Sequence, residues 1–161
     1  MITKNEFLKL IEPHEPCQQG LDLIDDCKDM EEVFTKMTCS SWEWLLKHQP
    51  QFVEHCDCWD ELDGYSWYGL LSSQPQFACH CDWSLLSGYQ WCVLLRRLPQ
   101  FAEHCDWSKL DGWDWSRLLK DKPQFSEHCD WVKLKCSDWA ELLLAQPQFK
   151  KYKEKHYDDK K

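Results

Sequence analysis

The chain has 161 residues, of which 43% are hydrophobic and eleven are tryptophan. This length suits a single domain, and the aromatic content excludes a disordered chain, which would be poor in such residues. The formal net charge of −9 argues against a general nucleic-acid binder, because such a protein needs basic patches to meet phosphate groups.

Residues 1–38 predict an N-terminal cap of three short helices, since they lack the pattern that follows them. Thr3 and Glu6 form a capping-box pattern that opens the first helix. A second helix is expected from about Cys17 to Cys27, and a second capping-box pattern, Asp29 with Glu32, opens the third. A solenoid needs such a cap, because an end repeat has no neighbour to cover its apolar face.

A tripeptide, Pro-Gln-Phe, then recurs at nearly fixed spacing, and a period of this kind decides the fold. Successive prolines are 25, 24, 24 and 24 residues apart, and the extra residue lies in the first unit, at Cys58. The five copies begin at Pro50, Pro75, Pro99, Pro123 and Pro147.

Each unit predicts two short helices. Trp115, Leu118 and Leu119 have the i, i+3, i+4 spacing of one helix face, over about ten residues. Pro123 then disfavours helical geometry in the residue before it and suits the first turn of a second, shorter helix. Alternation typical of strands is absent. We therefore predict an all-α, short-repeat α-solenoid of two-helix units, with five tandem repeats over residues 39–149, the last one partial.

Residues 150–161 predict the basic end of a C-terminal helix and a tail. They contain six lysines and three acidic residues, so this segment carries +3 and residues 1–149 carry −12. The chain shows neither a signal-peptide pattern nor the run of about 18 apolar residues that a membrane span needs. We expect a soluble, cytoplasmic protein that neither enters a membrane nor binds nucleic acid directly.

Cysteine and histidine recur together once in each unit. Four cysteines that each follow a histidine should lie on successive rungs, too far apart for disulfides, and are interpreted as small buried hydrophobes: Cys56, Cys81, Cys105 and Cys129. Adjacent His and Cys point to different sides of a helix, and zinc sites usually pair ligands as C-x(2–4)-C. We therefore predict no metal, no cofactor and no catalytic residue, with a metal- or thiol-dependent protein as the alternative.

An aromatic row offers the strongest binding signal. Tyr65, Tyr89 and Trp113 occupy one repeat position, two residues before the tryptophan of the predicted helix face, so they do not share that face. They either cover the seam between repeats or present interface anchors. Acidic residues near the starts of the first helices either cap helices or form an anionic stripe for a basic partner. The acidic candidates are Asp60, Glu61, Asp63, Asp111 and Asp114.

The unit that runs from Cys105 through Trp107, Leu110, Gly112 and Trp115 to Pro123-Gln124-Phe125 resembles Trp-rich tandem repeats in uncharacterised proteins of gut bacteria and their phages. The segment from Cys17 to Trp44 is similar to a module in small phage-associated proteins. This resemblance implies no assigned activity, although a phage protein would work in the host cytoplasm.

The expected function is protein binding without catalysis. Stacked helix pairs make an extended surface suited to that task. A sharper hypothesis is a phage-encoded inhibitor whose acidic, aromatic surface blocks a basic host defence protein, such as a nuclease or another nucleic-acid-binding protein. The alternatives are the metal- or thiol-dependent protein and a purely structural repeat protein.

Overall fold

The protein is an all-α repeat solenoid, as the period predicts. The structure is a computed structural model that describes residues 2–158, with side chains for residues 2–155. Within this range the regular elements are α-helices and 3₁₀ helices, and no strand is present. The chain forms two compact units, Met1–Cys81 and Asp82–Lys161, and the boundary between them falls inside a repeat.

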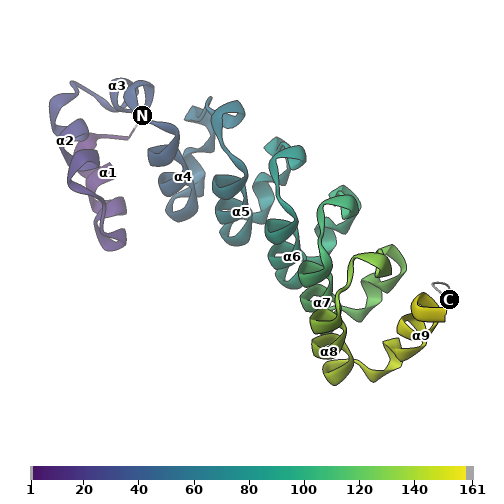
Figure 1. Cartoon of the computed structure of the whole chain (residues 1–161). Helices are drawn as coiled ribbons and strands as arrows, with labels where there is room; N and C mark the ends of the chain where they lie inside the picture. Colours follow the sequence, from purple (N-terminus) through teal and green to yellow (C-terminus); the bar gives the residue numbers. More distant parts are fainter. Residues whose placement is uncertain (1, 159–161) are drawn as a thin grey trace. The chain divides into compact units, whose positions relative to one another are not determined.

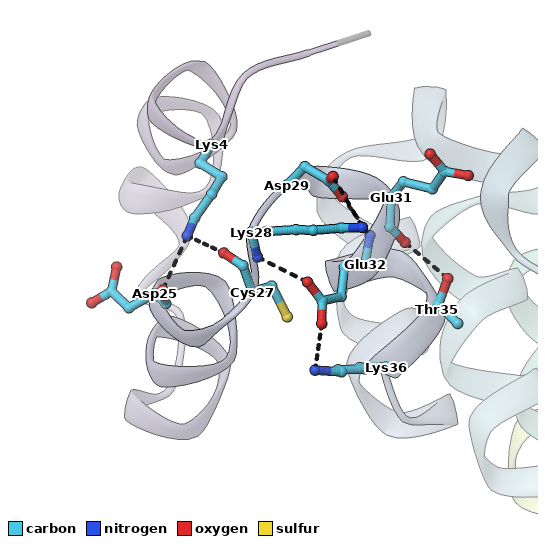
Figure 2. Close-up of polar contacts among 9 residues, drawn as sticks. All are labelled: Lys4, Asp25, Cys27, Lys28, Asp29, Glu31, Glu32, Thr35 and Lys36. Atoms are coloured by element: carbon cyan, nitrogen blue, oxygen red, sulfur yellow. Dashed lines mark hydrogen bonds and ion pairs between the residues drawn. The ribbon is translucent and has the colours of Figure 1, made fainter.

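The N-terminal cap contains the three predicted helices. They are α1 (Lys4–Ile11), α2 (Gln18–Asp26) and α3 (Met30–Lys36), with a 3₁₀ turn, η1 (Glu12–His14), after the first. The Thr3–Glu6 capping box is formed. Asp29 caps α3 by accepting from the Glu32 N–H, but the predicted reciprocal bond is not made, because the Glu32 carboxylate accepts from the N–H of Lys28 instead (Figure 2).

Five ten-residue α-helices confirm the first helix of each repeat. In the first unit α4 (Cys39–His48) packs against α5 (Gly64–Ser73). In the second unit α6 (Gly88–Arg97), α7 (Gly112–Asp121) and α8 (Cys136–Ala145) lie side by side, with the 3₁₀ segments beside them (Figure 1). Each helix turns one tryptophan into the core, and all five indoles are almost fully buried: Trp42, Trp67, Trp91, Trp115 and Trp139.

The second helix of each repeat differs from the prediction, because it is a 3₁₀ helix and not a short α-helix. Its six-residue copies are η2 (Pro50–His55), η4 (Pro75–His80), η6 (Pro99–His104) and η8 (Pro123–His128). Three-residue 3₁₀ turns start at the next tryptophan: η3 (Trp59–Glu61), η5 (Trp83–Leu85), η7 (Trp107–Lys109) and η9 (Trp131–Lys133). The i, i+3 spacing of Phe125 and His128 also fits the three residues per turn of this geometry.

Proline separates the two helices of a repeat, as predicted. Gln49, which precedes Pro50, has φ −136° and ψ 67°, outside the helical region, and so ends α4. Its side chain also donates to the Leu10 carbonyl oxygen at 2.8 Å. Gln74 and Gln146 make the same bond to the carbonyls of Lys47 and Lys120, at 2.8 Å each. The glutamine therefore donates to a carbonyl in the last turn of another helix, which is α1 for Gln49 and the helix of the preceding repeat for Gln74 and Gln146.

The tryptophans that open the 3₁₀ turns lie at the edge of the core. Trp59, Trp83, Trp107 and Trp131 are only partly buried, because one ring face packs on the buried tryptophan and the other is covered by a smaller ring. The four cysteines that each follow a histidine were interpreted as buried, and the structure partly agrees. Cys56 and Cys129 are buried, whereas Cys81 and Cys105 are partly buried.

Close contacts between neighbouring repeats explain the glycine that starts α7. A Cβ atom on Gly112 would overlap the Lys133 carbonyl oxygen and lie 2.6 Å from Oδ2 of Asp138. Gly88 meets Lys109 and Asp114 in the same way. In α8 this position is held by Cys136. The next segment of the chain, α9 (Lys150–Asp158), lies where the other repeats have their three-residue 3₁₀ turn. Glycine is thus needed at Gly88 and Gly112, where the next repeat approaches closely, whereas α4 starts with Cys39 at this position although α5 packs on it.

Lysines tie successive repeats of the second unit together. Lys109 Nζ donates to the carbonyls of Ser84 and Leu86, the latter at 2.9 Å. Lys133 Nζ donates to the carbonyls of Ser108 and Leu110 at 2.6 and 2.8 Å. Each ammonium therefore satisfies carbonyls of the preceding 3₁₀ turn.

The predicted basic C-terminal helix is present as α9 after η10 (Pro147–Phe149), while Asp159, Lys160 and Lys161 of the predicted tail lie outside the described residues. None of the helices in residues 2–158 combines the length and apolar character required to cross a membrane.

Candidate functional site: an exposed aromatic row

The second unit presents two of the three row residues as a pair. Tyr89 and Trp113 are the second residues of the adjacent helices α6 and α7. Their ring centroids are 6.0 Å apart, and the side chains remain 53% and 40% exposed. The rings therefore meet across the seam between two repeats and still offer an apolar surface to a partner. The pair thus covers the seam between two repeats, and its role as an interface anchor stays a prediction.

Arg117, which was not among the residues predicted from the sequence, lies against this aromatic pair. The guanidinium of Arg117 lies over the Trp113 ring, with Cζ 4.0 Å from the ring centroid. The spacing of Trp113 and Arg117 is i, i+4 on α7, which is a contact that the sequence could have suggested. A cation over an indole face is attracted by the ring quadrupole. The group therefore combines two aromatic rings with one positive charge.

In the first unit Tyr65 occupies the matching position of α5 and is 73% exposed. Asp63 caps this helix by accepting from the N–H groups of Tyr65 and Ser66, at 3.0 and 2.8 Å. The hydrogen bond from Ser66 is the main cause that lowers the pKa of Asp63, so this carboxylate stays charged beside the aromatic ring. The capping residue Asp63 and the candidate anchor Tyr65 thus lie in the same turn at the start of α5.

Asp60 and Glu61 lie on η3 of the same unit and are both exposed. The carboxylate of Glu61 accepts from the thiol of Cys39, with Sγ and Oε2 3.0 Å apart. These two carboxylates and Asp63 give the start of α5 three negative charges.

Asp111 and Asp114 flank Trp113 at the start of α7, but they have different surroundings. Asp111 is exposed and caps α7 by accepting from the Asp114 N–H at 2.9 Å. Asp114 is only 5% exposed, and burial is the main cause that raises its pKa. Its carboxylate accepts from the Asp111 N–H at 3.2 Å. Asp114 therefore serves the helix cap and is not part of the surface that a partner could reach.

Comparisons with known proteins assign no family. No protein-family model, curated protein or solved structure matches this chain. The Trp- and Pro-containing helical units and their exposed row are therefore interpreted from the chain's own geometry.

The repeated histidines have a structural partner. His80, His104 and His128 stack on Trp59, Trp83 and Trp107, with centroids 4.3 to 4.5 Å apart and planes within 6°. Each of these tryptophans also stacks on a buried tryptophan, so three rings form a sandwich in every complete repeat. His55 stacks on Phe34 of the cap in the same manner. Among the described residues, no group of three or more His, Cys, Asp or Glu side chains is arranged to hold a metal ion.

Burial keeps three of the thiols, those of Cys58, Cys92 and Cys105, in their protonated form. Burial raises the pKa of Cys105 to about 12, and it raises that of Cys92, on α6, to about 12 as well. Near the inserted Cys58, burial raises the pKa of that thiol to about 11, and its Sγ lies 3.8 Å from Sγ of Cys56. Because the thiolate is the nucleophile and the metal ligand, these thiols are poorly suited to either role.

Proposed function

We propose that the protein is a non-enzymatic helical-repeat module that binds another protein through its exposed aromatic row. The Tyr89–Trp113 pair carries this proposal, because two large aromatic side chains meet on the surface of neighbouring helices and stay accessible. Aromatic anchors of this kind, joined by arginine, dominate the energetics of protein interfaces. The rigid helices also hold the rings in place, which lowers the entropic cost of binding.

The expected partner has a basic surface. Residues 1–149 carry −12, and exposed carboxylates lie beside the row at Asp60, Glu61, Asp63 and Asp111. Charge complementarity of this kind speeds association and selects the partner. Together with the resemblance to repeats of gut bacteria and their phages, it supports a sharper version, in which a phage-encoded inhibitor blocks a basic, nucleic-acid-binding or nuclease protein of the host in its cytoplasm.

The test is affinity capture from a host lysate with the tagged full chain, in low and then moderate salt. A chain that carries Tyr65→Ala, Tyr89→Ala and Trp113→Ala should lose a partner that the original chain retains, while its helicity stays unchanged. Leu85→Ala with Val132→Ala is the matched control, because these two side chains are exposed apolar groups of the 3₁₀ turns and lie outside the row.

The outcomes separate the two parts of the proposal. Equal capture by the original and triply substituted chains would remove the aromatic row from the interface. Release of the partner by moderate salt would assign most of the affinity to the carboxylates, because exposed charges are screened by salt. Capture of nucleic acid without protein would contradict the proposed function.

A further inference from the structure

The N-terminal cap contains an apolar pocket that lies apart from the aromatic row in the chain. Its volume is about 370 Å³. Helices α1 to α4 all contribute apolar side chains to its wall, among them Ile11, Leu23, Ile24, Val33, Trp44 and Leu45. Ligand pockets usually measure about 300–1,000 Å³ and are lined mainly by hydrophobic side chains. This pocket is at the small end of that range, which suits the anchoring side chains of a peptide.

The pocket remains open partly because Gly20 of α2 lies in its wall. A Cβ atom at this glycine would meet only Sγ of Cys17, at 3.7 Å, which is ordinary van der Waals contact. A longer side chain at this position would therefore extend into the pocket without displacing the backbone.

Glu15 places a carboxylate at the rim of the pocket, and its backbone has an unusual conformation. Glu15 lies in the left-handed region, at φ 52° and ψ 62°, and no other non-glycine residue in the described part of the chain has a positive φ. The Cβ atom makes this conformation unfavourable for Glu15. Its exposed side chain lines the pocket. A strained residue of this kind is more common at binding sites than elsewhere.

The segment that supplies most of the pocket wall has an excess of carboxylates. Residues 2–36 contain nine acidic and four basic residues. Three of the lysines are already engaged: Lys4 Nζ donates to the carbonyls of Asp25 and Cys27 at 3.1 and 2.6 Å, Lys36 pairs with Glu32 at 2.7 Å, and Lys28 lies 3.9 Å from Asp29 (Figure 2). The exposed carboxylates of Glu12 and Glu15 are paired with none of these three lysines, whereas Asp26 interacts with Lys36 and Asp22 accepts from the Gln18 amide.

We propose that this pocket binds the apolar side chains of a basic, amphipathic peptide segment of another protein. The apolar wall would bury one or two large side chains, and Glu15 on the rim, together with the net negative charge of residues 2–36, would attract the lysines or arginines between them. Recognition of an amphipathic segment by an apolar groove uses anchors at i, i+3, i+4 and i+7. This site goes beyond the proposed function, because it does not involve Tyr65, Tyr89 or Trp113.

The probe is a fluorescein-labelled synthetic peptide of about 14 residues, with leucine at those helical anchor positions and lysine elsewhere. Its binding to the full chain is measured by fluorescence anisotropy. We expect it to bind at least tenfold more tightly than two control peptides, one with alanine at the anchors and one with glutamine in place of lysine. Equal affinity of the alanine peptide, or of the glutamine peptide, would overturn the proposal.

Variants of the pocket give the decisive comparison. Gly20→Phe should fill the pocket and weaken binding at least tenfold, whereas Gly20→Ala, the matched control, should bind as the original chain does. Glu15→Gln should weaken binding severalfold and reduce its dependence on salt. Where Gly20→Phe fails to fold, as judged by circular dichroism, Leu23→Lys tests the same wall by placing a positive charge on it.

Two further outcomes would count against this occupant. Unchanged affinity in both Gly20→Phe and Leu23→Lys would show that the peptide binds elsewhere. Concentration-dependent self-association that Gly20→Phe abolishes would assign the pocket to a second copy of the chain. The chain with the three substitutions in the aromatic row should still bind the probe, so failure of the proposed function leaves this test intact.

Discussion

Trp107 stacks on His128 with ring centroids 4.4 Å apart and planes within 4° of parallel. The same contact recurs in neighbouring repeats, and in the last one Tyr152 replaces histidine on Trp131, at 4.4 Å and 11°. A tyrosine has no imidazole with which to bind a metal ion, but its ring can stack on a tryptophan. The recurring property of this position is therefore a flat ring that covers an indole face.

His128 variants test this role. His128→Ala should lower the free energy of unfolding by about 1 kcal/mol, because an aromatic pair contributes about 0.5–1.5 kcal/mol beyond its buried area. His128→Tyr should be close to neutral, as Tyr152 already occupies the equivalent place. Urea denaturation measures both. An equal loss in the two variants would mean that the imidazole itself is required and would revive the metal alternative.

Gly112→Ala should lower the free energy of unfolding by more than about 1 kcal/mol, because overpacking a close contact typically costs about 1–3 kcal/mol. The added methyl group would overlap the Lys133 carbonyl oxygen of the next repeat. Gly20→Ala is the control. It makes only ordinary contact and should gain up to about 1 kcal/mol from helix propensity. Thermal denaturation compares the two, and a stable Gly112→Ala chain would contradict the packing of these repeats.

Thiol labelling tests the burial of the cysteines. Cys17 and Cys79 are exposed and should react with iodoacetamide in the folded protein at pH 8. Cys92 and Cys105 should react only after unfolding, because burial raises the pKa of each to about 12 and few thiolates form at that pH. Mass spectrometry of labelled peptides identifies the sites. Rapid reaction of Cys105 in the folded chain would instead support a thiol-dependent function.

The unit Met1–Cys81 should lose stability in mild acid through His48, the last residue of α4. Burial, and then the nearby charges of His14 and Lys47, lower the pKa of His48 below its ordinary value of 6.5. The imidazole of His14 stacks on it at 4.5 Å, Trp44 contacts it, and Lys47 pairs with Glu43. The unfolded chain therefore binds a proton more readily. The contribution of neutral His48 is complete above pH 6.5 and is lost as the pH falls through the lowered value.

His48→Gln removes this titration. Unfolding measured between pH 7.5 and 5.5 should show a smaller loss of stability in the variant than in the original chain. Because the carboxylates titrate in both proteins, the difference between them reports on the histidine. Identical profiles would show that His48 has the same pKa in the folded and unfolded chain.

Much of the fold was determined by local sequence. The period of the Pro-Gln-Phe tripeptide is visible in the sequence itself. The ten-residue helices and the capping box at Thr3 depend on residues within about one helical turn of each other, so short-range geometry was enough to predict them. The exposure of Tyr65, Tyr89 and Trp113 also agrees with their spacing from the buried tryptophans.

The tertiary structure decided what depends on residues in neighbouring segments. The sequence could not show that Asp114 is buried, that Trp107 lies in a sandwich of rings, or that Gly112 faces a carbonyl of the next repeat. It also could not show the pocket in the cap, which four helices enclose together. Burial, stacking and close approach arise from packing between elements distant in the chain, and helix periodicity carries no information about that packing.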